Sequence, residues 1–538
     1  MKRWLVLALA LCLALTMMGI VPAATAEGEP KTLRVMVSRS PGVIDFDTNE
    51  YVLWLEEQTG IDVQWEQVAN TSVRDKLPVV MMGGDLPDAI MGFGLNAAQQ
   101  VNYGVQEKLF IPLNGLIEEY GVEIKRMFAE QPGVEDLITM ADGNIYALPT
   151  YSDIIHCNYA QKFQINTTFL DVLGMEMPTT TDEFYDYLKA VKENDPNGNG
   201  IADEIPMIGC LTAWHEDPFC WLMEPFIFDD GMYGKKVDLD ENGKIFSILD
   251  KEGYRDGLRY IKKLYSEGLL YEGSLTMPFE QTKAIGENPD AMILGGKTTA
   301  GVGGIAEVGG ERYQNYRALP PIEGPTGLRQ TPWFRYANVR IGAYAITKDC
   351  EDTETALKLA DFMLSYESTM RLRMGVKGVD WRDAEEGETT FDGRPAVWAR
   401  IKQYTGEAQN QHLDNDGIFY ETRGMFLDDC AYDHSKTIMD TLASQHLLAV
   451  DTVERYVEYA KEVLPPVTVP AEYSEEFYPL EAELKIFYEQ ARAAFISGAM
   501  DLDADWDGYV NDLKAIGLDR YLEILQIAYD QGKIKIGA

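Results

Sequence analysis

The segment 195–204 (DPNGNGIADE) has the oxygen donors and the glycine spacing of a calcium-binding loop. In such loops side-chain oxygens stand at positions one, three, five and nine. A glycine at position six allows a sharp turn, and position seven offers its backbone carbonyl. The residues at the ligand positions are Asp195, Asn197, Asn199, Ile201 and Asp203. Because hard oxygen donors on a flexible loop favour Ca²⁺ over Mg²⁺ or Zn²⁺, the segment predicts a calcium ion, structural if it lies away from a ligand cleft.

The end of this loop departs from the usual pattern. Position twelve, normally a bidentate glutamate, is Pro206, and Glu204 at position ten is the residue that can close the coordination shell. The alternative is a turn without metal, because asparagine, glycine and aspartate favour tight turns by themselves.

A helix is expected to lead directly into the calcium loop. Thr180 and Glu183 have the spacing of a capping box, in which each side chain accepts a hydrogen bond from the backbone N–H of the other residue. Phe184, Leu188 and Val191 fall on one apolar face at helical spacing. A helix that continues straight into the loop supports the calcium interpretation.

The wider pattern of elements indicates more than one folding unit. The chain of 538 residues is too long for a single hydrophobic core. Up to about residue 150, strand-like and helical patterns alternate, which is typical of an α/β domain with a mainly parallel sheet, and the remainder is mostly helical. We expect two discontinuous lobes. The first takes 31–149 and about 296–345, and the second takes 150–295 and about 346–538, including the calcium loop.

The first residues have the pattern of a secretory signal peptide. Basic residues precede an apolar run at 4–21, and small residues at positions 24 and 26 predict cleavage after Ala26, giving a leader of 1–26. A membrane anchor is the alternative, but the run ends at Pro22. Lipid anchoring through Cys12 is not expected, because the large Leu11 precedes it. We therefore expect an exported protein, extracellular, at the cell surface or periplasmic.

The net charge excludes some classes of binding partner, and the spacing of the cysteines argues against disulfide bonds. The chain carries 87 acidic and 47 basic side chains, a net charge of −40, which would repel nucleic acid and anionic lipid. A neutral or cationic ligand suits this charge, although a local pocket can still bind an anion. The cysteines beyond the leader are widely spaced without a CxxC pair, so we expect free thiols.

Several short segments resemble motifs of one family, the large extracellular solute-binding proteins of type 1, including their LipO-like and alginate-oligosaccharide-binding branches. The matching segments are 83–88 (GGDLPD), 141–149 (ADGNIYALP), 178–180 (PTT) with the calcium loop after it, 257–270 (GLRYIKKLYSEGLL), 375–381 (GVKGVDW), 495–498 (FISG) and 506–509 (WDGY). The calcium-loop segment is the most specific of these. The absence of a lipidation signal departs from the family and puts membrane tethering in doubt.

The resemblance implies a periplasmic-binding-protein-like fold of type II, with two hinged α/β lobes that close on a ligand and a helix-rich C-terminal region. It implies the substrate-binding component of an ABC importer, with an oligosaccharide as ligand and permease subunits as partners. It also implies a structural calcium ion that does not touch the ligand. Trp381, in segment 375–381, is favoured as a sugar platform by the same resemblance. We expect a monomer.

A sugar-binding cleft requires aromatic platforms for the C–H faces of the sugar and polar side chains for its hydroxyls. The remaining candidate ligand residues are Tyr151, Trp214, Trp333, Arg335 and Arg39. A packed hinge tyrosine is the alternative for Tyr151, and a solvated loop arginine is the alternative for Arg39. Of Trp214 and Trp221, one is expected to line the cleft and the other to lie in the core.

Functions of other classes remain open alternatives. A polysaccharide hydrolase or lyase is the main rival, but the chain has no HExxH or GxSxG motif, and its five histidines form no metal pair at helical spacing. The segment 301–306 (GVGGIA) imitates a dinucleotide loop but lacks its third glycine, so a hinge or cleft loop is preferred. A sugar-sensing or adhesion module without transport is a further alternative.

Overall fold

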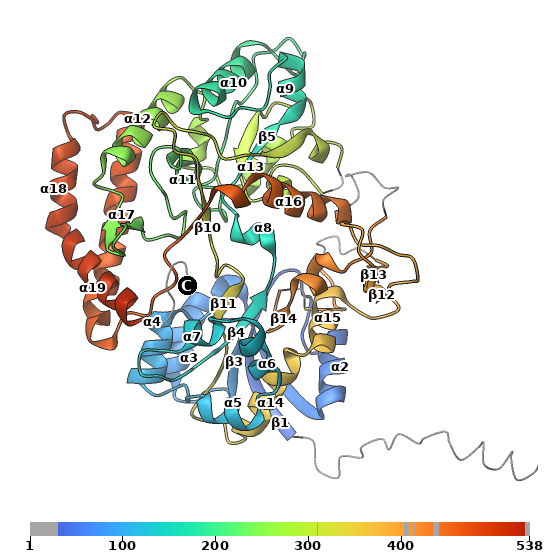
Figure 1. Ribbon diagram of the computed structural model, residues 1–538. Helices are drawn as coiled ribbons and strands as arrows, with labels where there is room; N and C mark the ends of the chain where they lie inside the picture. Colours follow the sequence, from blue (N-terminus) through green and yellow to red (C-terminus); the bar gives the residue numbers. More distant parts are fainter. Residues whose placement is uncertain (1–30, 309, 403–407, 414, 434–440, 533–538) are drawn as a thin grey trace, which may run out of the picture.

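The computed structural model describes residues 31–308, 310–402, 408–413, 415–433 and 441–532, so the expected leader lies outside the described residues. These residues form two lobes, one above the other in Figure 1. One lobe is built on a six-stranded sheet, and the other combines a three-stranded sheet with most of the long helices. The expected two-lobed α/β fold is therefore confirmed.

The first lobe contains the six-stranded sheet, with strand order β14-β4-β11-β3-β1-β2. β1 pairs in parallel with β2 and β3, and β14 pairs in parallel with β4, whereas β11 runs antiparallel to both of its neighbours. Val35 and Val37 of β1 lie in one apolar core and Met36 lies in another, so both faces of this strand are buried. The strands are β1 (Lys31–Arg39), β2 (Ile61–Ala69), β3 (Ala89–Met91), β4 (Leu148–Ser152), β11 (Val339–Ile346) and β14 (Tyr420–Glu421).

Helices pack on both faces of this sheet, and a short hairpin of β12 (Trp381–Asp383) and β13 (Trp398–Arg400) extends from the lobe. The helices are α2 (Glu50–Thr59), α3 (Val73–Gly83), α4 (Ala97–Gln100), α5 (Asn114–Tyr120), α6 (Glu123–Glu130), α7 (Val134–Ile138), α14 (Thr353–Met363) and α15 (Tyr366–Met374).

The second lobe is organised around the antiparallel sheet β8-β5-β9 and a large apolar core. Its other strands form two small pairs, β6 with β7 and β10 with β15. The strands are β5 (Phe163–Asn166), β6 (Val237–Leu239), β7 (Ile245–Ser247), β8 (Gly296–Thr298), β9 (Tyr316–Leu319), β10 (Thr331–Trp333) and β15 (Ala460–Glu462).

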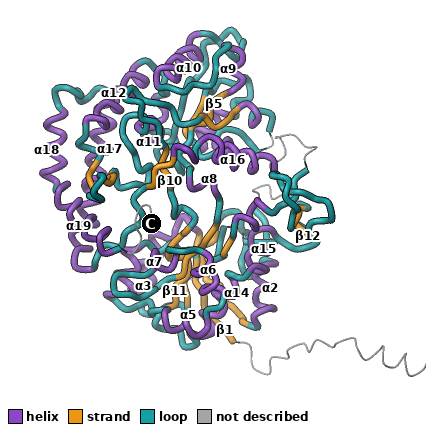
Figure 2. Tube along the Cα trace, in the orientation of Figure 1, coloured by secondary structure: helices purple, strands orange, loops and turns teal. Residues whose placement is uncertain are grey.

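The C-terminal helices α17, α18 and α19 stand along one side of the molecule (Figure 2). They contribute to the same core as β5 and α10, so the helix-rich end of the chain belongs to the second lobe. The helices of this lobe are α9 (Thr167–Leu173), α10 (Thr181–Glu193), α11 (Pro218–Met223), α12 (Glu252–Ser266), α13 (Phe279–Gly286), α16 (Thr441–Arg455), α17 (Ala471–Ser497), α18 (Trp506–Ile516) and α19 (Leu518–Gln531).

The chain passes between the lobes after β4, where the short helix α8 (Ile155–Asn158) follows, again before β11, and again after β14. Two of the expected lobe boundaries are therefore wrong. Residues 296–319 belong to the second lobe, because β8 and β9 pair with β5. Residues 353–374 belong to the first lobe, because α14 and α15 share its core. Neither a short strand such as β8 nor a helix such as α14 carries a local sign of the lobe that it joins, which is why the sequence misassigned them.

Among the described residues, none of the helices combines the length and the apolar character needed to cross a membrane. The five cysteines of this part of the chain are free thiols, as expected.

Candidate functional site

The helix before the calcium loop is fixed by its cap and by its apolar face. The Thr180 side chain accepts a hydrogen bond from the backbone N–H of Glu183 at 3.2 Å. The Glu183 carboxylate accepts from the backbone N–H and the hydroxyl of Thr179, at 2.8 and 2.7 Å, so half of the expected capping box is replaced by a bond one residue earlier. Phe184, Leu188 and Val191 are fully buried, as their spacing predicted.

The loop itself curls around its side-chain oxygens. The Asp195 carboxylate accepts hydrogen bonds from the backbone N–H groups of Asn199 and Gly200, at 3.2 and 2.9 Å. The side-chain oxygen of Asn199 accepts from the Ile201 N–H at 2.7 Å. Asp195 and Gly200 have φ angles of 46° and 76°, and the left-handed backbone at Gly200 is the turn expected at position six. The Ile201 carbonyl accepts from the Asp203 N–H at 3.0 Å.

Within the described part of the chain, the acidic groups of the loop are partnered by neutral amides or have no partner. The side-chain amides of Asn197 and Asn199 donate to the Asp203 carboxylate at 3.1 and 3.2 Å. Both carboxylate oxygens of Glu204 are buried without a hydrogen-bond partner among the described residues. Burial raises the pKa of Glu204. The nearby backbone N–H groups of Glu204 and Asn197 oppose this shift, and the carboxylates of Asp195 and Asp203 add to it. A cation at this point would compensate the buried carboxylate, so the donor set fits Ca²⁺.

The acidic side chains of the loop are not by themselves grouped around an ion. Among the described residues, no group of three or more His, Cys, Asp or Glu side chains is placed to hold an ion. Calcium binding would therefore replace the amide contacts to Asp203 with contacts to the ion.

Four aromatic side chains gather where the second lobe meets the crossing before β11. We call Trp214, His215, Tyr233 and Phe334 the aromatic cluster. The His215 ring lies 4.8 Å from Trp214, 5.0 Å from Phe334 and 5.5 Å from Tyr233, measured between ring centroids. His215 is buried, whereas Trp214 and Tyr233 are 47% and 63% exposed. The cluster therefore offers two aromatic surfaces held in place by a buried imidazole, an arrangement suited to stacking on a sugar.

The imidazole at the centre of this cluster is neutral at physiological pH. Burial lowers the pKa of His215 to about 3, and the charge of Lys162 contributes in the same direction. A neutral ring keeps the surroundings of Trp214 apolar. Trp221, the other tryptophan of this region, lies in the core of the second lobe with 1% of its surface exposed.

Trp333 and Arg335 lie on the same crossing. Trp333 is half-buried against Tyr159 and Tyr456. The Arg335 guanidinium lies 6.0 Å from the centre of the Trp333 ring and pairs with Glu462 at 3.4 Å. Both residues thus contact second-lobe partners, since β10 pairs with β15, which carries Glu462. Their expected part in ligand binding stays a prediction.

The first lobe presents charged side chains at the edge of its sheet, where β4 and β14 end and β11 begins. The Arg373 Nε pairs with the Glu421 carboxylate at 3.1 Å, and Glu421 is fully buried. Arg340 and Arg373 both donate to the side-chain oxygen of Asn415, at 3.2 and 2.9 Å. Ligands of α/β proteins bind at the carboxyl ends of parallel strands, so this edge is a candidate ligand surface. None of these residues was predicted from the sequence, because β14 is too short to recognise.

Tyr151 and Arg39 act in the framework of the first lobe. The Tyr151 hydroxyl donates to Gln131 at 2.7 Å and its ring packs edge-on against Tyr420. Tyr151 is buried in the core, so the structure supports the alternative of a packed tyrosine. Arg39 ends β1 and donates to the backbone carbonyls of Val43 and Ile44, at 2.7 and 3.1 Å, which braces the loop that follows.

Trp381 is not an exposed platform, and the expectation for it is wrong. Its ring is buried in a small core with Met370 and Trp398. Its indole N–H donates to the Gly375 carbonyl at 3.0 Å. The glycine-rich segment before it folds back on the β12–β13 hairpin. This segment and the hairpin together cover the Trp381 ring.

Two α/β lobes joined by repeated crossings, with aromatic side chains on one lobe and charged strand ends on the other, define a two-lobed solute-binding protein. The family comparison agrees, since the model of the bacterial extracellular solute-binding proteins matches residues 40–370. The chain belongs to this family.

Two curated relatives extend over nearly the whole chain. The fructooligosaccharide ABC transporter substrate-binding protein FusA of Streptococcus pneumoniae is 27% identical over 518 residues, which is 94% of this chain and 91% of FusA. The lipoprotein LipO of Bacillus subtilis is 24% identical over 567 residues, 99% of each chain.

Solved structures share the fold. FusA of S. pneumoniae in complex with kestose has a TM-score of 0.78 at 24% identity, covering 93% of this chain and 99% of FusA. An EF-hand mutant of FusA has a TM-score of 0.77 at 24% identity, covering 93% and 99% of the two chains. The alginate-binding protein AlgQ2, solved without calcium ion, has a TM-score of 0.67 at 22% identity, covering 93% and 98%.

Proposed function

We propose that this chain is the substrate-binding component of an ABC importer and captures an oligosaccharide between its two lobes. The observation that carries the proposal is the aromatic cluster, in which buried His215 holds the exposed rings of Trp214 and Tyr233. The cluster lies beside a crossing between the lobes, where a ligand would contact both lobes. FusA, which is named for fructooligosaccharide, supports a sugar as the ligand.

The mechanism follows from two surfaces, the aromatic cluster of the second lobe and the charged sheet edge of the first lobe. The C–H face of a sugar ring stacks on Trp214 or Tyr233, while Arg340 and Arg373 of the first lobe donate hydrogen bonds to its hydroxyls. A ligand that contacts both lobes stabilises the closed arrangement over the open one, which drives a hinge motion. The closed pair of lobes is then the form that the permease subunits recognise. No bond of the sugar is made or broken, so the protein is not an enzyme.

The same proposal covers calcium, export and assembly. Calcium bound by the acidic and amide side chains of segment 195–204 stabilises the second lobe without touching the sugar. Among proteins with this fold, FusA has been solved as an EF-hand mutant and AlgQ2 without calcium ion, which supports a calcium-binding loop here. The protein is exported by its leader and acts outside the cytoplasmic membrane as a monomer.

A thermal-shift screen of the mature protein tests this function. Neutral oligosaccharides, acidic oligosaccharides and peptides are added in turn, and the sugars are analysed by chromatography afterwards. A neutral oligosaccharide that raises Tm and is recovered intact is the expected result, because a ligand that binds only the native state stabilises it. Recovery of shorter products would identify a hydrolase or lyase instead, and a response to peptides alone would refute the sugar ligand.

A further inference from the structure

A groove runs along α17 in the second lobe, beside the aromatic cluster. One hollow of about 370 Å³ lies between α17 and the segment 233–249. A second hollow of about 260 Å³ shares Lys485 and Tyr488 with the first and continues to Arg492. We call these two adjoining hollows the α17 groove. Ligand pockets in proteins typically measure about 300–1,000 Å³, so the groove has room for a small part of a ligand.

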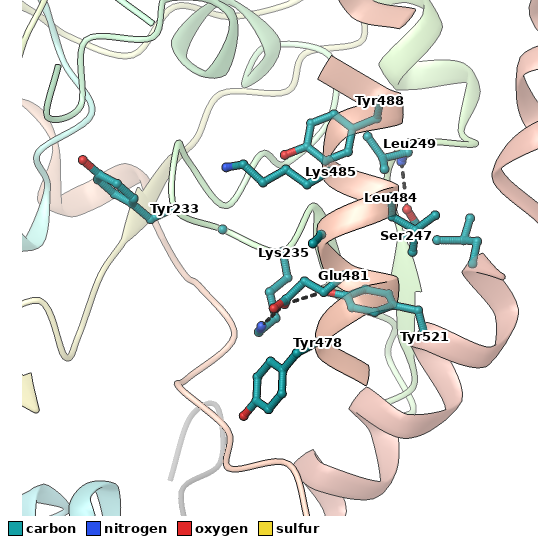
Figure 3. Close-up of a pocket in the computed structure, with 13 residues that line it drawn as sticks. Tyr233, Lys235, Ser247, Leu249, Tyr478, Glu481, Leu484, Lys485, Tyr488 and Tyr521 are labelled. Carbon is teal, nitrogen blue, oxygen red and sulfur yellow. Dashed lines mark hydrogen bonds and ion pairs between the residues drawn. The ribbon is translucent and has the colours of Figure 1, made fainter. Parts of the chain in front are cut away.

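The groove has the side chains of a sugar site. Figure 3 shows Tyr478 and Tyr488 on the same side of the hollow, with Lys235 and Glu481 between them. Tyrosine rings supply stacking surfaces, and the charged groups supply donors and acceptors for hydroxyls.

One buried polar group of the groove lacks a partner. Arg492 is only 7% exposed, and its Nε–H has no acceptor among the described residues. Its guanidinium is held in place by Asp217, at 3.2 Å, and by the ring of Phe219, at 4.4 Å from the ring centre. A buried donor without an acceptor is costly, and a hydroxyl oxygen of a ligand in the second hollow would satisfy it.

The charges of the groove compensate one another. Lys235 pairs with Glu481, Lys485 pairs with Glu489, and Arg492 pairs with Asp217. Because each cation already has a carboxylate beside it, the groove has no excess charge for an anionic sugar. This favours a neutral saccharide.

The groove adjoins the aromatic cluster at one residue, Tyr233. Tyr233 lines the first hollow, and Figure 3 places it across the hollow from the α17 side chains. The same ring lies 5.5 Å from His215 of the cluster. A chain of sugars that begins on Trp214 and Tyr233 can therefore continue into the groove.

We propose that the α17 groove is a second saccharide subsite, which binds the outer units of a neutral oligosaccharide whose first units lie between the lobes. The inference rests on the proposed function and deepens it, because it makes α17 the element that selects for chain length. Longer neutral oligosaccharides then bind more tightly than short ones of the same series.

Titration calorimetry with sugars of two lengths tests this subsite. The probes are kestose against a longer inulin-type fructan, and maltotriose against a longer maltodextrin. The wild-type protein is expected to bind the longer member of one series at least about tenfold more tightly. Tyr478→Ala, which removes a wall, and Arg492→Lys, which removes the Nε–H donor but keeps the charge beside Asp217, should each abolish this preference and leave the affinity for the short sugar unchanged. Ile486→Ala, on the exposed side of α17, is the matched control and should change neither affinity.

Failure of the subsite and failure of the proposed function give different results in this experiment. Equal affinity of the wild-type protein for short and long sugars would overturn the subsite and leave the proposed function intact. A preference that survives in both groove variants would also overturn it. Absence of binding to every sugar would overturn the proposed function, and the subsite with it.

Discussion

The imidazole of His215 stands almost perpendicular to the indole of Trp214, at 88°, with 4.8 Å between the ring centroids. The same imidazole packs against Phe334, which lies on the crossing before β11. His215 has a φ angle of 53°, a backbone conformation that costs energy for a residue other than glycine. The buried ring therefore ties an exposed tryptophan of the second lobe to a segment that leads into the first.

Replacement of the two neighbouring tryptophans should separate binding from folding. Trp214→Ala removes an exposed stacking surface, so we expect a loss of oligosaccharide affinity of about tenfold or more with little change in the free energy of unfolding. Trp221→Ala leaves a cavity in the second lobe and should lower that free energy by about 3–5 kcal/mol. Calorimetry and urea denaturation measure the two effects. Unchanged affinity in Trp214→Ala would contradict the assignment of the cluster.

Stability should fall on the acid side partly because of His215. Its folded pKa of about 3 lies below the unfolded value of about 6.5, so below pH 6.5 the unfolded state binds a proton that the folded state does not. The stabilising contribution is complete above pH 6.5 and is lost progressively as pH falls toward 3. His215→Phe should flatten the dependence of Tm on pH across this window. Parallel curves for the variant and the wild type would show that His215 does not bind its proton in this way.

Calcium should stabilise the protein through segment 195–204. At a calcium concentration of one hundred times Kd, binding to the folded state alone adds about 2.7 kcal/mol. We expect chelator to lower the Tm of the wild-type protein, and Asp195→Ala or Glu204→Gln to remove most of this response. Asp240→Asn is the matched control, since Asp240 shapes a turn by accepting the N–H groups of Asn242 and Lys244, both at 2.8 Å. A wild-type Tm that is indifferent to chelator would exclude the metal.

The pair of Arg373 and Glu421 should contribute strongly to the stability of the first lobe. Arg373→Met leaves the buried Glu421 carboxylate without its main cation, which costs about 3–5 kcal/mol in such pairs. The exposed pair of Arg520 and Glu476 is a control, and Arg520→Met should cost no more than about 1 kcal/mol. Urea denaturation of both variants measures the loss in the free energy of unfolding. Equal losses in the two variants would mean that the Glu421 carboxylate is effectively solvated.

Local features were predictable from the sequence, whereas pairings between distant segments were not. The helix before the calcium loop, its buried face and the left-handed Gly200 follow from neighbouring residues alone. The lobe assignment of β8 and of α14 depends on partners far along the chain, and those expectations were wrong. The edge residue Glu421 was missed because a two-residue strand has no recognisable period.

The tryptophans illustrate the same limit. One of Trp214 and Trp221 was expected in the core, without a choice between them. Trp221 stands in the apolar segment PFCWLM, which forms the buried helix α11, whereas polar residues follow Trp214. Trp381 was misjudged because the covering residue Trp398 lies on the other strand of a hairpin.

Titration calorimetry of the calcium-loaded mature protein with neutral oligosaccharides, followed by mass analysis of the recovered sugar, tests the central claim most directly. The account predicts saturable binding of one sugar per protein, recovery of that sugar intact, and weakened binding in Trp214→Ala. Cleavage of the sugar, or binding that is equally strong in Trp214→Ala, would contradict capture of an oligosaccharide at the aromatic cluster.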